Sequence, residues 1–392
     1  MNRILSLVSL AILAAPLAAQ AEPEMKSGDV KKLAKPFGAW VEAKVENDPS
    51  GASEAMVDME EYIKKMEKKL KGRKALSMVA DWELIFSTGR SFDTSGKLIK
   101  KGKVLEREMG AYRYLVWLPS AYAPAKNTYP TLMLLDDDPA ATLEAMPKLV
   151  KDGFIIIAPQ IVDVEPEQLM DPEGRTCILG PLGQSSVSYR VDRSRLFLVG
   201  KGENGIAYAT AYASILPHYF RGLATVGAPA ADVKAKKNLD LMQVKEVADV
   251  NEAADWALNV EAGNLYPTEF EIDLVEPWMG VGFWVQATSF ESGEDLPEGK
   301  VARMKVSVDR GTNTITIDGE FVYKVQLNLN DILVDLDKPI VILRNGESYS
   351  FQASRSLGTM LNTFANNLDG RVYPAKVRSL DMPVPAEEPT DG

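Results

Sequence analysis

Short apolar runs between residues 111 and 229 constrain the fold of this chain more than any other feature. They read YRYLVWLP, YPTLMLLDDDP, GFIIIAPQ, RLFLVGKG and GLATVGAP, and segments compatible with helices, such as ATLEAMPKLVKDG and IAYATAYASILPHYF, lie between them. Continuous Val, Ile and Leu runs without alternation are typical of strands that are covered on both faces. Strand and helix signals in alternation predict an α/β fold with a mostly parallel sheet and flanking helices.

The last third of the chain follows a different pattern. From Phe270 onward it contains short strand-like segments, among them FEIDLV, VARMKVSVD, TITIDG, YKVQLNLND and KPIVILRNG. Residues 303–308 alternate between polar and apolar, and Asn345-Gly346 is a strong signal for a two-residue hairpin. These features predict a β-rich C-terminal domain over residues 269–380.

The length of 392 residues and the hydrophobic content of 46% favour two domains rather than one. The α/β domain is expected over 111–268, with the 230–268 stretch linking or covering the two units and a helix at 250–258. Residues 22–110 are expected to form a lead-in, loosely packed over 22–52, followed by helices. One helix is predicted from Ser53, because Met56, Met59, Ile63, Met66 and Leu70 recur on one face. The Pro-rich, acidic segment 381–392 is expected to be a flexible tail.

The first 21 residues, MNRILSLVSLAILAAPLAAQA, have the pattern of a secretory signal peptide. Arg3 precedes an apolar run from Ile4 to Ala19, and Ala19-Gln20-Ala21 fits the small-residue rule for cleavage after Ala21. Pro16 interrupts the run, which argues against an uncleaved anchor. The mature protein is therefore expected to be secreted or periplasmic, without stable insertion in a membrane.

The charge and the rare residues exclude several classes of function. The net charge of −11 argues against nucleic acid and against anionic membrane surfaces as partners. The basic run Lys64–Lys74 also carries acidic neighbours and is interpreted as a solvated helix face. Cys177 is the only cysteine and His218 the only histidine, so an intramolecular disulfide is impossible and a zinc site is nearly excluded. We expect Cys177 to be buried and predict neither a cofactor nor a metal.

The segment RLFLVGKGENGIAYATAYA reads as a strand, a glycine-rich turn and a helix. Together with YRYLVWLPSAY, YPTLMLLDDDP, VDRSRLFLVGKGENG and FRGLATVGA, it resembles the esterase-like α/β-hydrolases of secreted bacterial proteins related to feruloyl esterases and phospholipase/carboxylesterases. The stretch VDLDKPIVILRNG is similar, more weakly, to the tail domain of some of these proteins. The resemblance implies an α/β-hydrolase fold whose nucleophile elbow, G-x-S-x-G, matches Gly200, Lys201, Gly202, Glu203 and Asn204, followed by Gly205.

The chain departs from this family at the positions that carry the chemistry. Gly202 stands where the family has its serine, so the usual nucleophile is missing. His218 follows the elbow helix, whereas the family's base follows the last strand of the sheet. We expect His218 to lie at the surface. The family's oxyanion loop corresponds to Asp136, Asp137 and Asp138, whose carboxylates would repel a developing oxyanion.

Three other interpretations of these residues are consistent with the sequence. Ser185, Ser186 and Ser188, expected in a loop before the elbow strand, could form a relocated site with Lys201 as base. Asp136–Asp138 could bind Ca²⁺, but a helix N-cap with solvated charge is favoured. The elbow glycines could serve the backbone alone, with Gly205 allowing the helix to approach the sheet.

The leading hypothesis is a secreted α/β-hydrolase-like protein without a Ser-His-Asp triad that binds a small molecule or a protein. The alternatives are an active secreted esterase or peptidase with a displaced nucleophile, and a structural protein of the cell envelope. A fold does not fix a function, so the esterase analogy alone does not decide among them.

Overall fold

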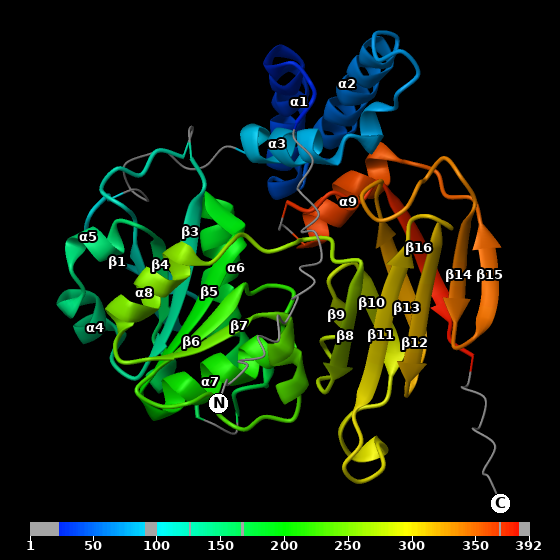
Figure 1. Cartoon of the computed structure of the whole chain (residues 1–392). Coiled ribbons are helices and arrows are strands. Elements are labelled where there is room, and N and C mark those ends of the chain that lie inside the picture. The colour runs from blue at the N-terminus through cyan, green and yellow to red at the C-terminus, as the bar shows by residue number, and fades with distance from the viewer. Residues whose placement is uncertain (1–22, 91–99, 125–126, 166–167, 368–369, 384–392) are drawn as a thin grey trace, which may run out of the picture.

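The computed structural model describes residues 23–90, 100–124, 127–165, 168–367 and 370–383. The predicted signal peptide, the predicted cleavage site and most of the predicted tail lie outside these residues. Figure 1 shows a unit coloured cyan to green, a second unit coloured yellow to red, and blue N-terminal helices above the second unit. Within the described part of the chain, no helix is long and apolar enough to cross a membrane.

The first unit is built on a seven-stranded sheet in the order β1-β2-β4-β3-β5-β6-β7. β2 pairs antiparallel with both β1 and β4, and the remaining neighbours are parallel. The strands are β1 (Val104–Met109), β2 (Tyr112–Trp117), β3 (Tyr129–Asp136), β4 (Ile155–Pro159), β5 (Val191–Lys201), β6 (Gly222–Val226) and β7 (Gln243–Val247). The mixed α/β architecture predicted from the apolar runs is confirmed.

Helices cover both faces of this sheet, which explains why its strands read as uninterrupted apolar runs. One face packs against α6 (Pro172–Ser188) and α7 (Gly202–Ile215). The other packs against α4 (Pro139–Ala145), α5 (Lys148–Lys151) and α8 (Val250–Asn259), so the helix expected at 250–258 is confirmed. Cys177, on α6, is fully buried, as predicted.

β7 was not predicted, because the apolar runs assigned to the parallel sheet end at residue 229. This strand extends the parallel sheet through pairing with β6, so part of the 230–268 stretch belongs to the sheet itself. β1 also pairs into the sheet, although it precedes residue 111, the predicted start of the domain. Both are outer strands of the sheet and are partly exposed, so neither shows the continuous apolar run of a central strand.

The second unit contains a four-stranded sheet, β16-β13-β10-β9, and a five-stranded sheet, β15-β14-β12-β11-β8. Its elements are β8 (Glu269–Leu274), β9 (Val281–Gly282), β10 (Val285–Phe290), β11 (Ala302–Asp309), β12 (Thr314–Glu320), β13 (Val322–Leu329), β14 (Ile340–Arg344), β15 (Glu347–Phe351), α9 (Leu357–Asn367) and β16 (Ala375–Asp381). The β-rich C-terminal part is therefore confirmed. So is the hairpin, because Asn345 and Gly346, both at positive φ, join β14 to β15.

The N-terminal helices share an apolar core with the second unit. They are α1 (Ser27–Val45), α2 (Pro49–Glu67) and α3 (Val79–Gly89). The ring of Phe86 lies 4.7 Å from the ring of Phe37 on α1 and 4.7 Å from that of Phe364 on α9. The expectation of a loosely packed lead-in over 22–52 is therefore wrong. Residues 27–45 form a helix with buried Leu33, Phe37 and Trp40, which satisfy a 3- and 4-residue spacing.

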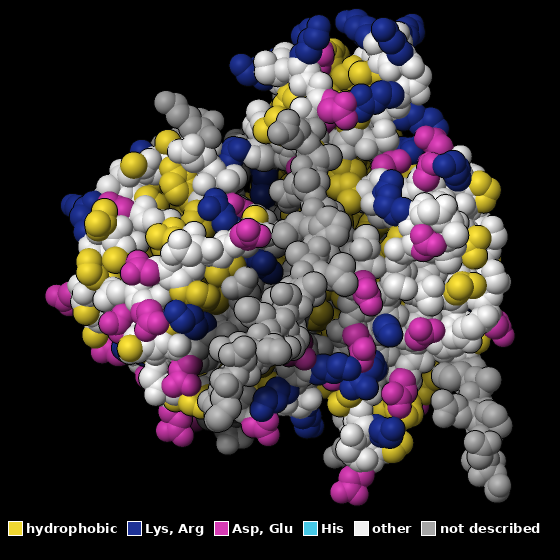
Figure 2. Space-filling model, in the orientation of Figure 1, with side chains coloured by type: hydrophobic (Ala, Val, Ile, Leu, Met, Phe, Trp, Pro, Cys, Tyr) yellow, Lys and Arg dark blue, Asp and Glu magenta, His cyan; other side chains and the backbone are white. Residues whose placement is uncertain are grey.

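The methionine stripe packs as expected, with Met59, Ile63 and Met66 buried against this core, although its helix begins at Pro49 rather than near Ser53. The basic residues that follow are exposed, and Lys65, Arg73 and Lys74 pair with carboxylates. Figure 2 shows Lys and Arg side chains gathered over the N-terminal helices, with acidic and basic groups intermixed elsewhere on the visible face. The run Lys64–Lys74 is thus a solvated surface.

Candidate functional site

The turn between β5 and α7 has the backbone geometry of a strand-to-helix elbow. β5 ends at Lys201 and α7 begins at Gly202, which adopts a φ of +75°. A Cβ on Gly205 would lie 2.4 Å from the carbonyl oxygen of Leu135, and one on Gly200 would lie 2.8 Å from that of Gly205. Glycine is required at these two positions because α7 lies directly on the sheet. This packing agrees with the interpretation that the elbow glycines serve the backbone alone.

Asp137 occupies the space next to the position where a nucleophile would project. A Cβ on Gly202 would lie 2.3 Å from Oδ2 of Asp137 and 2.8 Å from its Cγ. The two residues meet because β3 and β5 are neighbours, with Asp136 in register with Lys201. A carboxylate therefore stands where a side chain at position 202 would begin.

The other two aspartates of this loop have different roles. Asp138 accepts from the backbone N–H of Ala141 at 3.0 Å and so caps α4, which confirms the helix N-cap. Asp136 is not solvated as expected, because it is only 2% exposed. Its Oδ2 lies 3.2 Å from Nζ of Lys201, which also donates to Oγ1 of Thr142 at 2.5 Å. In the described chain no group of three or more His, Cys, Asp or Glu could hold a metal ion.

The only histidine lies at the opposite edge of the sheet from the elbow. His218 follows α7 and precedes β6, whose first residue, Gly222, pairs with Phe197. Gly202 comes after Lys201, which pairs with the last residue of β6. At about 3.3 Å per residue, the length of β6 alone separates His218 from Gly202 by roughly 13 Å. His218 is 8% exposed and its ring lies 4.4 Å from that of Tyr219, so the surface position expected for it is wrong.

The serines weighed as substitute nucleophiles lie on a helix, not in a loop. Ser185, Ser186 and Ser188 belong to the last turn of α6, where Ser185 is fully buried and Ser186 donates to the carbonyl oxygen of Leu182 at 2.6 Å. α6 ends just before β5 begins, whereas Lys201 is the last residue of β5. The length of β5 therefore separates these serines from the proposed base.

A hollow of about 380 Å³ lies beside the elbow, at the carboxyl ends of β5, β6 and β7. Ligands of open α/β sheets commonly bind at this edge. The residues that line it among those described are Ala141, Thr142, Ala145, Met146, Lys201, Val226, Ala248, Asp249, Val250 and Asn251. Serine, cysteine and histidine are absent from this lining. The hollow offers hydrogen-bonding groups and apolar walls.

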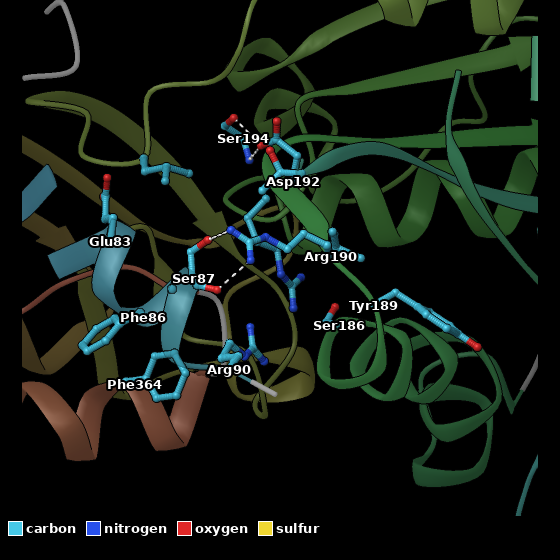
Figure 3. Close-up of a pocket in the computed structure, with 15 residues that line it drawn as sticks. Glu83, Phe86, Ser87, Arg90, Ser186, Tyr189, Arg190, Asp192, Ser194 and Phe364 are labelled. Atoms are coloured by element: carbon cyan, nitrogen blue, oxygen red, sulfur yellow. Dashed lines mark hydrogen bonds between the residues drawn. The ribbon is translucent and has the colours of Figure 1, made fainter. Parts of the chain in front are cut away.

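A second cavity of about 230 Å³ lies where the two units and the N-terminal helices meet. Figure 3 shows side chains from α3, from the start of β5 and from α9 around it. Arg190 is fixed across this junction, because its guanidinium donates to the carbonyl oxygen of Ser87 at 2.8 Å and to the hydroxyl of the same residue. We call this space the junction cavity. No motif in the sequence predicted this cavity.

No protein-family model matches this sequence, and a search of curated proteins returns no match. Among solved structures, a thermostable esterase is 14% identical with a TM-score of 0.29, over 40% of this chain and 52% of that chain, about half its length. A ferulic acid esterase is 18% identical with a TM-score of 0.28, over 41% and 88%. A lipase/esterase from Lactobacillus plantarum is 14% identical with a TM-score of 0.23, over 41% and 89%. A likeness at these TM-scores assigns neither an activity nor a ligand to this chain.

Proposed function

We propose that this chain is an exported protein with an α/β-hydrolase-like domain that acts by binding and not by acyl transfer. The observation that carries the proposal is the place of Asp137, whose carboxylate stands beside the side-chain position of Gly202. Acyl transfer needs a nucleophile there, a base within hydrogen-bond reach and donors for the oxyanion. Here the nucleophile is missing, and the Asp137 carboxylate lies beside its position.

The groups that could replace the triad support the same conclusion. Lys201 is held by the buried Asp136 carboxylate and by the Thr142 hydroxyl, and neither contact directs its amine toward a nucleophile. His218 lies at the far edge of the sheet and packs beside Tyr219 and Phe283. The elbow is thus a scaffold element that positions α7, with binding left to the cavities around the sheet.

Restoring a serine tests this proposal, since Gly202→Ser is expected not to create an esterase. A serine hydroxyl is a weak nucleophile without a positioned base, and the new side chain would meet the Asp137 carboxylate. Loss of one oxyanion donor alone lowers rates by roughly 10²–10³. Hydrolysis of nitrophenyl acetate by the variant should therefore stay at the level of the parent protein.

The matched control is the double variant Gly202→Ser/Asp137→Ala, which removes the steric conflict but supplies no base. It should fold and remain inactive. Burst kinetics in either variant, well above the parent protein, would show that a usable base and oxyanion hole exist. The chain would then be a recently inactivated enzyme, contrary to the proposal.

A further inference from the structure

We propose that the outer edge of β15 is an interface between two copies of this chain, whose β15 strands pair antiparallel about a two-fold axis centred on Tyr349. The five-stranded sheets of the two copies then form one continuous sheet. In a two-fold contact the same surface of each copy meets itself, so the strand has to be complementary to its own sequence. This contact does not depend on the proposed ligand-binding function.

The outer edge of β15 is open. In the described sheets, β14 is the single neighbour of this strand. Figure 1 shows β15, in orange, at the side of the second unit that faces away from the seven-stranded sheet. Its first four residues are exposed. The backbone groups on the outer side of a last strand have no strand partner, so they can bind a further strand.

The other outer strands of the described sheets have features that hinder such pairing. β1, β7 and β16 contain lysine or arginine, and β16 also pairs in an irregular register. β9 has two residues. β8 contains three acidic residues, and the Asn238 side chain makes two hydrogen bonds with the backbone of Asp273. β15 has one charged residue, Glu347, and an unbroken register with β14. It therefore has the least protected edge of the six.

Two aromatic side chains add apolar surface to this edge. Tyr349 and Phe351 pair with Ile342 and Ile340, which are fully buried, so both rings lie on the core side of the sheet. The rings are stacked, with centroids 5.9 Å apart. Tyr349 is nevertheless 41% exposed, because the sheet ends at β15. The rings of a second copy would cover this surface, and aromatic pairs across strands stabilise sheets.

The sequence of β15 fits its own copy in the register centred on Tyr349. Ser348 then lies opposite the partner's Ser350, and two serines in opposite positions can hydrogen-bond. Glu347 lies opposite the partner's Phe351, so no charge faces a like charge. The strand is five residues long, and a contact of this size favours weak, reversible association over an obligate dimer.

Disulfide cross-linking of the mature protein tests the contact and its register. Directly opposite residues of an antiparallel pair have Cα atoms about 4.5–5.5 Å apart, within reach of a disulfide. Tyr349→Cys should therefore form a covalent dimer under mild oxidation, at least about tenfold faster than Tyr323→Cys, whose tyrosine is 40% exposed on β13. Ser350→Cys should also react slowly, because its two copies lie diagonally, about 7–8 Å apart. The native Cys177 is fully buried.

Sedimentation over a range of concentrations measures the association without a new cysteine. The parent protein should form a reversible dimer. Tyr349→Lys should weaken this dimer by about tenfold or more, because two lysines would face each other across the axis. Tyr323→Lys is the matched control, since it removes an equally exposed tyrosine from another sheet and should leave the dimer unchanged. Thermal unfolding verifies that each variant is folded.

Any of three results would overturn the proposal. One is a parent protein that stays monomeric up to about 1 mM, which would assign the open edge to a different protein or to none. Another is a dimer that Tyr349→Lys does not weaken. The third is cross-linking of Tyr349→Cys that is no faster than that of Tyr323→Cys or of Ser350→Cys, which would contradict the register centred on Tyr349.

Discussion

Replacing Arg355 with leucine is expected to destabilise the protein by about 3–5 kcal/mol, the usual cost of removing one partner of a buried ion pair. The Arg355 side chain is 5% exposed and donates to Asp331 and, at 2.8 Å, to Asp337. Lys74, which follows α2, also reaches Asp337, so the cluster ties the N-terminal helices to the β-rich unit. Leucine would leave the half-buried Asp331 carboxylate without its cation. Urea unfolding monitored by tryptophan fluorescence gives the loss.

The pH dependence of this effect follows from the two carboxyls. Hydrogen bonds from Arg355, followed by those from Lys74, lower the pKa of Asp337 from 3.8 to about 2. A lowered pKa stabilises the fold above the unfolded value, and this stabilisation is lost as the pH falls from about 4 toward 2. Burial raises the pKa of Asp331 even with Arg355 present, so its charge is costly once the arginine is gone.

The gap in stability between the parent protein and Arg355→Leu should therefore narrow as the pH falls through this window. Lys338→Met is the control, since it removes an exposed lysine paired with Asp335 and should cost no more than about 1 kcal/mol. An equal effect of the two substitutions, or a gap independent of pH, would contradict the role assigned to the buried cluster.

Phe86→Ala should cost about 3–5 kcal/mol, because it leaves a cavity in the core that α1, α3 and α9 share. This loss of stability should appear in the N-terminal helices and in the β-rich unit together. Hydrogen exchange should report faster amide exchange in α1 and β13 alike, with the seven-stranded sheet less affected. Val57→Ala, on an exposed position of α2, serves as the control. Faster exchange confined to α1–α3 would mean that these helices form a separate unit.

Local patterns predicted the parts of the fold whose residues are neighbours in sequence. The apolar runs identified the central strands, and Asn345-Gly346 identified a hairpin. β7 escaped because its sequence, QVKEV, is mostly polar and only Val247 is buried. α1 could have been found, since Val30, Leu33, Phe37 and Trp40 have helical spacing, but the surrounding polar residues and Pro36 obscured it.

The candidate site, like the fold, could be predicted from the sequence only in part. The glycine at position 202 is visible in the sequence, and so is the acidic run at 136–138. That Asp137 faces Gly202 depends on the pairing of β3 with β5, which the sequence does not state. The junction cavity brings Ser87 next to Arg190 and Phe86 next to Phe364, contacts between segments far apart in the chain. No local signal marks such contacts.

The measurement that tests the central claim most directly is treatment of the purified mature protein with a fluorophosphonate, followed by intact mass and peptide mapping. An active serine esterase in a parallel reaction shows that the reagent works. The absence of a nucleophile at Gly202, with Lys201 held by Asp136, predicts no adduct on the folded protein. A stoichiometric adduct on one serine, which does not form when the protein is denatured before treatment, would contradict the account and identify a displaced active site.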